Sequence, residues 1–204
     1  MGLDMYLTAE LSVYDCRWDR DKDGNIKKDV HKDRVKEMKT NEKIRKLFPD
    51  APKTDNLNFI RVEFEAGYWR KANQIHNWFV KNVQDGKDDC GRYYVSKEKM
   101  QELLNICKQI KNEVKLKTGT VTNGYTYKKD EKTGEMQKVE HLEEGKVIEN
   151  PEICEELLPS QSGFFFGNTD YNEWYIYAIE RTIEILEQAL KLPENYTIYY
   201  HSSW

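Results

Sequence analysis

The spacing of hydrophobic residues changes along the chain between a two-residue and a helical period, and this change limits the possible folds most. Residues 4–16 alternate apolar with polar side chains and are rich in Tyr, Leu and Val, which predicts a strand. Four further segments predict short strands, by alternation or by a fully apolar run: 59–64, 93–95, 163–166 and 196–201.

Other segments repeat their apolar residues at helical spacing, so helices separate these strands. Four segments have this pattern: 31–47, 68–83, 96–114 and 171–191. Ser96 is a suitable cap for the third helix, and Asp170 with Glu173 forms a capping-box-like start for the fourth. Because the strands do not alternate strictly with the helices, we expect an α+β fold with a mainly antiparallel sheet and about four helices.

Residues 119–142 predict a polar β-hairpin with Thr133-Gly134 near its tip. Few of its side chains are apolar, so we expect it to project from the body as an insertion. Residues 1–204 contain no repeat and no linker, which favours a single domain.

Composition excludes several classes of protein. Aromatic residues make up 12% of the chain, and such side chains bury large areas, so a folded core is expected although charged residues reach 33%. No apolar stretch approaches 18 residues, and the first 16 residues do not form a signal peptide. The four cysteines are scattered without a CxxC pair, which is typical of reduced, mostly buried thiols. We therefore expect a cytoplasmic protein with no membrane partner, no cofactor and no metal.

Charge is divided unevenly along the chain. Residues 17–53 hold 13 basic and 8 acidic residues, whereas residues 140–194 hold 3 basic and 13 acidic ones. These blocks would be solvated surface or would meet separate partners. The basic stretch 27–46 can meet phosphates, but its acids are interleaved, the pI is about 5.7 and no nucleic-acid motif is present. Nucleic acid is therefore an unlikely partner.

One motif matches part of a calcium-binding loop. Asp19, Asp21 and Asp23 followed by Gly24 fit the first positions of an EF-hand, but Val30 stands where a bidentate Glu is needed. An acidic hairpin turn explains the same residues, so we expect no tightly held calcium.

The predicted helix 68–83 carries the first candidate ligand face. Arg70, Asn73, Gln74 and Asn77 share one face with His76 beside them, and Trp69 and Trp78 border it. Neutral amides with one arginine suit a planar, anionic ligand. Alternatively, these amides satisfy the backbone of loops that pack on the helix.

Two further segments supply candidate ligand contacts. Ser162 and Asn168 precede the helix 171–191, whose N-terminus favours anions, although Asp170 would compete for its free amides. In the last strand, alternation places Tyr199 and His201 on one face and sends Ile198 and Tyr200 to the core.

We expect His76 and His201 to lie within about one ligand's width of each other. A pocket needs apolar walls and a few convergent polar groups, and these two segments offer them. The sequence contains no catalytic motif of a known hydrolase or kinase, so we assign no catalytic residue. The two histidines would nevertheless be the acid–base pair of a small phosphodiesterase or nuclease-like enzyme, if the chain is one.

Three blocks resemble a group of small proteins encoded by phages and prophages. They are the opening Met-Gly-Leu-Asp-Met-Tyr-Leu, the stretch from Tyr68 to His76, and Leu157-Leu158-Pro159 with the Gly-Phe-Phe-Phe-Gly that begins at Gly163. The resemblance implies a phage-encoded accessory protein in the cytoplasm of an infected or lysogenic bacterial host. It carries over no site residues.

The sequence therefore favours a binding protein that sequesters a small anionic, nucleotide-like ligand, such as a host-defence signal, over an enzyme. The predicted contacts are Trp69, Arg70, Asn73, His76, Asn77, Ser162, Asn168, Tyr199 and His201. A third reading is an inhibitor of a host protein, with the hairpin 119–142 or the acidic segment 140–157 as its contact surface. The oligomeric state does not follow from the sequence.

Overall fold

The computed structural model describes residues 2–14, 23, 59–130, 133–163 and 166–204. The chain divides into two units, Met1–Ala9 with Phe64–Trp204, and Glu10–Glu63. In the smaller unit, the Glu10 carboxylate accepts from Ser12 at 2.9 Å and pairs with Arg61 at 3.0 Å. The single domain predicted over residues 1–204 stays a prediction, because most of the smaller unit lies outside the described residues.

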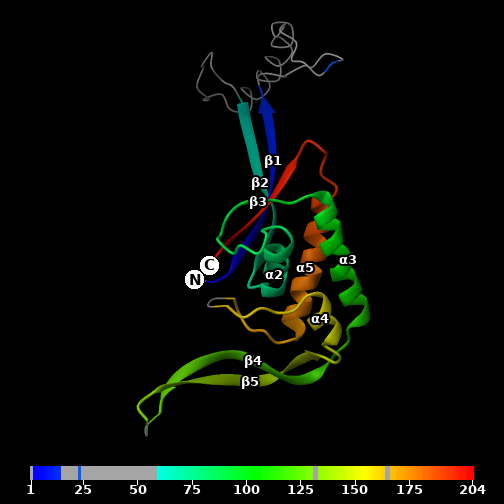
Figure 1. The fold of residues 1–204 in the computed structure, drawn as a ribbon. Helices are drawn as coiled ribbons and strands as arrows, with labels where there is room; N and C mark the ends of the chain where they lie inside the picture. Colours follow the sequence, from blue (N-terminus) through cyan, green and yellow to red (C-terminus); the bar gives the residue numbers. More distant parts are fainter. Residues whose placement is uncertain (1, 15–22, 24–58, 131–132, 164–165) are drawn as a thin grey trace. The chain divides into compact units, whose positions relative to one another are not determined.

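The fold is α+β, as the sequence predicts, and the described part of its main sheet has four strands in the order β2-β1-β6-β3 (Figure 1). Their bounds are β1 Asp4–Tyr14, β2 Phe59–Arg70, β3 Tyr93–Tyr94 and β6 Thr197–Ser203. Strands β3 and β6 are antiparallel, with Tyr93 opposite Tyr200 and Tyr94 opposite Tyr199. Beyond β2, the Lys71 amide donates to the Leu3 carbonyl at 2.8 Å.

Alternation along β1 separates the two faces of this sheet. Leu3, Met5 and Leu7 are fully buried, whereas Asp4 and Tyr6 between them are half-buried. The buried face carries helices α2 (Asn73–Asn82) and α5 (Glu173–Ala189).

Direct contacts fix these helices on the sheet. On α2, the Phe79 ring stacks on Tyr200 of β6 with 3.9 Å between centroids. On α5, Thr182 accepts from the Trp69 indole N–H at 2.9 Å. Gly67 lies so close to Ile185 that an added Cβ would be 2.2 Å from its Cγ2.

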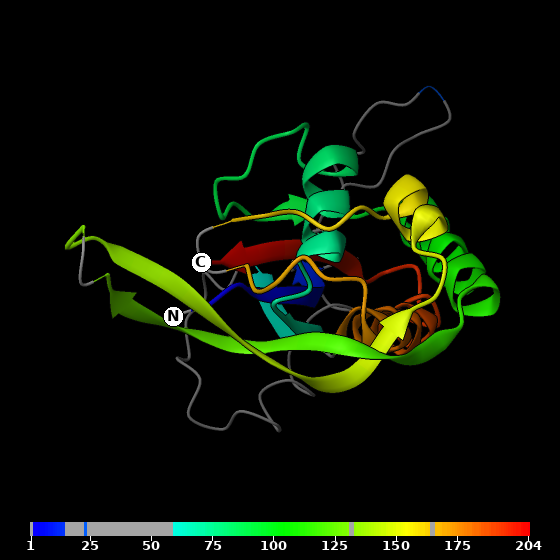
Figure 2. The same ribbon diagram turned by 90° about the horizontal axis from the view of Figure 1, so that it is seen from below.

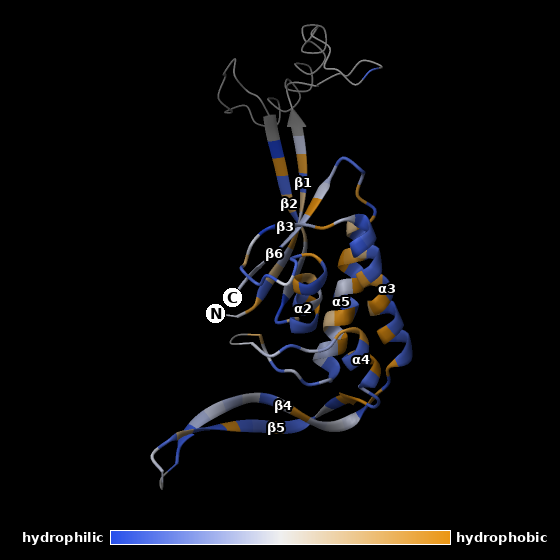
Figure 3. Cartoon of the chain, in the orientation of Figure 1, coloured by the Kyte–Doolittle hydropathy of each residue, from blue (hydrophilic) through white to orange (hydrophobic). Residues whose placement is uncertain are grey.

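Helix α3 (Lys97–Glu113) packs along α5, and Ser96 caps it as predicted by accepting from the Lys99 amide. Figure 3 shows hydrophobic residues on both helices. The buried residues of α3 are Met100, Leu103, Leu104, Cys107 and Ile110. Salt bridges from Lys108 and Lys111 to α5 are half-exposed and add little to stability. A short helix, α4 (Glu152–Leu157), was not predicted.

The predicted hairpin is present and is longer than expected. Strands β4 (Leu116–Lys129) and β5 (Met136–Ile148) pair antiparallel, and Figure 2 shows their strong twist. Val121 and Ile148 are buried near its base, while most other side chains are exposed, as a polar projection requires.

Three predicted boundaries are wrong. The segment 68–70 belongs to β2, and α2 begins only at Asn73, because Lys71 takes a positive φ of 56° that turns the chain out of the sheet. Helix α5 is capped by Asn172 and not by Asp170.

Other predictions concern residues that the structure leaves undescribed. Gly163 and Phe166 lie in no strand, and the two residues between them are outside the described part. The helix 31–47 and the loop from Asp19 to Gly24, apart from Asp23, also fall outside it.

Candidate functional site

The face of the sheet opposite the helices carries most of the candidate site. We call it the tyrosine face; it consists of Tyr6, Tyr68, Arg70, Tyr94, Tyr199 and His201, with Arg92 at its edge. Within the described residues, α2 and α5 both pack on the other face. Tyr94 is 61% exposed, and both arginines are exposed as well. The remaining side chains of the face are half-buried.

Three rings form a row across neighbouring strands. Tyr6 of β1 stacks on His201 of β6 with 4.8 Å between centroids and 12° between planes. Tyr68 of β2 lies 5.3 Å from Tyr6 on its other side, at 47°. The row thus joins aromatic groups from β2, β1 and β6 into one continuous surface.

The Tyr68 hydroxyl has a fixed partner at this end of the row, since it donates to the Asp4 carboxylate. This hydrogen bond, with burial and the negative charge of Asp4, raises the pKa of Tyr68 above 10.0. Arg70, two residues further along β2, opposes the rise with its positive charge. Tyr68 is therefore a neutral, oriented ring at ordinary pH.

A second cluster continues the face toward β3. The Arg92 guanidinium lies 4.1 Å from the centroid of the Tyr199 ring, a cation–π contact. Tyr94 meets Tyr199 edge-on at 6.4 Å and is the most exposed ring of the face. An exposed cation and an exposed ring therefore both contact Tyr199 at this edge.

Arg70 supplies a second cation, at the opposite edge. It is exposed at the end of β2, and strand alternation puts it on the same face as Tyr68. Trp69 between them points the other way, and only 3% of it is exposed. Of the predicted contacts, Arg70, Tyr199 and His201 thus share one face, and Trp69 belongs to the core.

The predicted ligand face of α2 is not open, and this expectation is wrong. Asn73 is 2% exposed: its side-chain N–H group donates to the carbonyls of Phe166 (3.2 Å) and Asn168 (2.8 Å). Its side-chain oxygen accepts from the Gln161 amide at 3.0 Å. Asn77, also buried, donates to the Pro159 carbonyl at 3.3 Å. These amides bind the backbone of residues 159, 161, 166 and 168 and so hold this loop on the helix. This is the alternative that the sequence left open, in which the amides satisfy loop backbone and no ligand.

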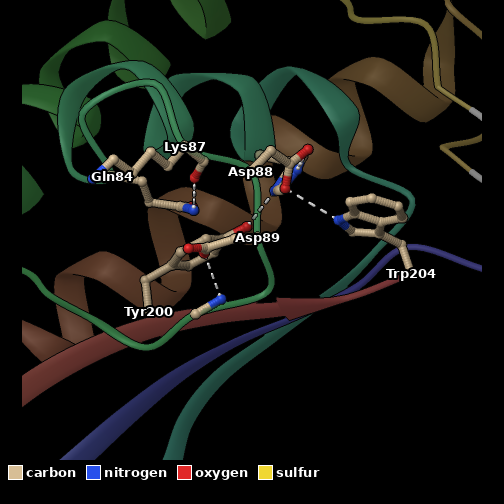
Figure 4. A network of polar contacts seen from close by, with 8 residues as sticks. Gln84, Lys87, Asp88, Asp89, Tyr200 and Trp204 are labelled. Atoms are coloured by element: carbon tan, nitrogen blue, oxygen red, sulfur yellow. Dashed lines mark hydrogen bonds and ion pairs between the residues drawn. The ribbon is translucent and has the colours of Figure 1, made fainter.

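His76 is fully buried and belongs to a polar network with Tyr200 and Asp88 on the core side of β6. Figure 4 shows Asp88 and Tyr200 together with Trp204. The Nδ1 of His76 lies 2.7 Å from the Tyr200 hydroxyl and its Nε2 lies 3.0 Å from Asp88. The other Asp88 oxygen accepts from the Trp204 indole at 3.1 Å. An aspartate that orients a histidine is common in catalytic sites, but Tyr200 is fully inaccessible, and burial raises its pKa well above 10.0.

His76 and His201 therefore lie on opposite faces of β6, contrary to the expectation that they would share a cleft. His76 contacts Tyr200, which points into the core, whereas the adjacent His201 points outward onto Tyr6. A strand backbone separates the two rings, so they cannot act together on one substrate.

Ser162 and Asn168 are both exposed in the loop before α5 and are not part of the tyrosine face. Two of the first amides of α5 already have a side-chain partner. The Asn172 side-chain oxygen accepts from the amides of Trp174 (2.9 Å) and Tyr175 (3.4 Å).

The described part of the chain was also compared with what a metal site or a reactive thiol requires. No group of three or more His, Cys, Asp or Glu there could hold a metal ion. Cys107 and Cys154 are buried, and burial raises the pKa of both thiols, which makes them poor nucleophiles. Cys90 is exposed. No described helix is long and apolar enough to cross a membrane.

Sequence reasoning missed four residues of the face: Tyr6, Tyr68, Arg92 and Tyr94. A signal for Tyr6 existed, because the alternation that buries Leu3, Met5 and Leu7 must turn Asp4 and Tyr6 outward. The sequence predicts Tyr68 on a helix, and this wrong assignment gives no reason to expect its contact with Tyr6 in the sheet. Arg92 and Tyr94 become part of the face only through the pairing of β3 with β6, which no local pattern reveals.

Searches of protein-family models, of curated proteins and of solved structures found no match to this chain.

Proposed function

We propose that the protein binds a small anionic, nucleotide-like ligand on the tyrosine face and sequesters it without changing it chemically. The observation that carries the proposal is the position of the Arg92 guanidinium, 4.1 Å from the centroid of the Tyr199 ring, which the exposed Tyr94 meets edge-on. A cation next to exposed aromatic surface matches the two halves of a nucleotide, its phosphate and its base.

Each part of the face has a role in this proposal. Base–aromatic stacking contributes about 1–3 kcal/mol per base, and Tyr94 offers the most accessible ring. Arg92 and Arg70 would pair with phosphate oxygens through charge-assisted hydrogen bonds. His201, held by its stack on Tyr6, would contact an edge of the base.

The biological setting of the proposal comes from the resemblance to phage and prophage proteins. A phage accessory protein that holds a nucleotide would lower the free concentration of a signal used in host defence. Such a role needs affinity and no turnover. It accords with a site that has exposed cations and rings.

The enzymatic alternative, a phosphodiesterase using His76 and His201, is weaker on this geometry. Its two proposed groups lie on opposite sides of β6, and His76 is fully buried. General acid–base catalysis requires both groups within hydrogen-bond reach of the substrate.

A specific observation keeps the protein-contact alternative open. The β4–β5 hairpin exposes large apolar side chains, namely Leu116, Tyr125, Tyr127, Met136 and Leu142. Aromatic and methionine side chains are frequent in protein interfaces. A host protein captured in a pull-down and lost when these residues are replaced would favour this role.

One incubation separates binding from catalysis. The protein is mixed with AMP, GMP and a set of cyclic nucleotides, and bound and free fractions are analysed by chromatography. The proposal expects a nucleotide that co-elutes with the protein and is recovered intact. Cleaved product would instead establish catalysis, and the absence of any bound nucleotide would contradict the proposal.

A further inference from the structure

The two cations of the tyrosine face stand at opposite edges of the sheet. Arg70 ends β2, the first strand in the order β2-β1-β6-β3, while Arg92 immediately precedes β3, the last. Three inter-strand spacings separate these edges, which is about 14 Å. The row of Tyr68, Tyr6 and His201 lies between them.

We propose that the ligand of this face is a two-base unit with two separate phosphate groups, one held by Arg70 and the other by Arg92. This inference rests on the proposed nucleotide-binding function and makes it more specific. The Arg92 guanidinium is held over the Tyr199 ring and Arg70 lies beyond Tyr68, so a single phosphate would have to draw both side chains away from these positions to pair with both. A nucleoside triphosphate has enough charge, but its phosphates are contiguous and would gather at one arginine.

The aromatic surface between the arginines is also divided for two bases. One part is the stacked row of Tyr68, Tyr6 and His201, and the other is the edge cluster of Tyr94 and Tyr199. Four-stranded sheets with aromatic side chains on an open face hold two or three bases in known single-strand-binding modules. Here the rings come from all four strands, and each arginine adjoins a different part of the surface.

Isothermal titration with three probes tests the inference. The probes are AMP, ATP and the linear dinucleotide pApA, which has two bases and two separated phosphate groups. The wild type is expected to bind pApA at least about tenfold more tightly than either AMP or ATP. Arg70→Gln and Arg92→Gln should each weaken pApA binding by about tenfold, whereas AMP should respond to only one of the two substitutions.

Arg181→Gln is the matched control, since Arg181 is an exposed arginine on α5, on the other side of the sheet. It should leave the affinity for every probe unchanged. ATP binding as tight as pApA binding, or an Arg70→Gln variant with unaltered pApA affinity, would overturn the two-phosphate inference and leave the binding function intact. Failure of the wild type to bind any of the three probes would overturn the proposed function itself.

A two-base unit can be a free dinucleotide or part of a longer single strand, and one more titration distinguishes these sources. A seven-residue adenylate strand that binds no more tightly than pApA assigns the free dinucleotide. A strand that binds more tightly assigns single-stranded nucleic acid.

Discussion

Tyr6 of the first strand and His201 of the last stack face to face, with ring centroids 4.8 Å apart and planes inclined by 12°. Each ring limits the rotation of the other, and Tyr68 closes the row on the far side of Tyr6. The aromatic surface is thus ordered before any ligand arrives. Preorganisation of this kind lowers the entropic cost of binding.

Asn73→Ala is expected to destabilise the protein by about 1–3 kcal/mol. The substitution removes three hydrogen bonds to the backbone of the loop 159–168 and leaves the Phe166 carbonyl without this donor in a buried place. Urea denaturation measures the change in the free energy of unfolding.

Asn168→Ala is the control for this prediction. The Asn73 side chain binds the backbone carbonyl of residue 168, and the Asn168 side chain is exposed, so its loss should change stability by less than about 0.5 kcal/mol. Equal effects of the two substitutions would show that Asn73 does not hold the loop as described.

Gly67→Ala is expected to lower stability by about 1–3 kcal/mol, because the new methyl group would overlap Cγ2 of Ile185 on α5. The same change in an Ile185→Ala background should cost clearly less, since the overlapping atom is then gone. Thermal unfolding of the four proteins gives this coupling energy. Strictly additive effects would mean that β2 and α5 do not pack at this position.

Stability should decrease as the pH rises above about 10, in part because of Tyr200. Burial raises the pKa of Tyr200 in the folded protein, so the unfolded chain loses this proton first. The stability that neutral Tyr200 contributes is therefore complete below the pKa of this tyrosine in the unfolded chain. It is lost as the pH rises from there toward the higher pKa in the folded protein.

Tyr200→Phe tests this window. The variant keeps the ring on Phe79 but loses the hydrogen bond to His76, so we expect it to be less stable by about 1–3 kcal/mol at neutral pH. Its stability should then fall less steeply than that of the wild type as the pH rises above about 10. Tyr177→Phe, at an exposed position, should leave the slope unchanged, and an unchanged slope in both variants would contradict the burial argument.

The sequence predicted the fold class, the long hairpin and the core side of the last strand correctly. Ile198 and Tyr200 are buried as expected, because a two-residue period leaves little choice once one face packs on helices. The start of α2 was predicted wrongly, since the positive φ of Lys71 has no signature in a non-glycine residue.

The candidate site was predicted only in part, for a reason that concerns solvent exposure. Asn73 and Asn77 have the composition of a ligand face, but a loop more than 80 residues away in sequence covers them. Polar side chains buried against backbone and those open to a ligand look alike in a sequence. Tyr199 and His201 were placed on an outward face by alternation alone, a local rule that needs no tertiary information.

The most direct test of the tyrosine face compares two matched double variants by titration with AMP and pApA. Tyr94→Ser with Arg92→Gln alters the face, and Tyr177→Ser with Arg181→Gln makes the same chemical changes on α5. Tyr94 and Tyr177 are similarly exposed, at 61% and 63%, so both variants should keep a melting temperature close to that of the wild type. The account predicts at least about tenfold weaker binding for the first variant and unchanged binding for the second. Equal affinities of the two variants, or wild-type protein that binds neither probe, would contradict it.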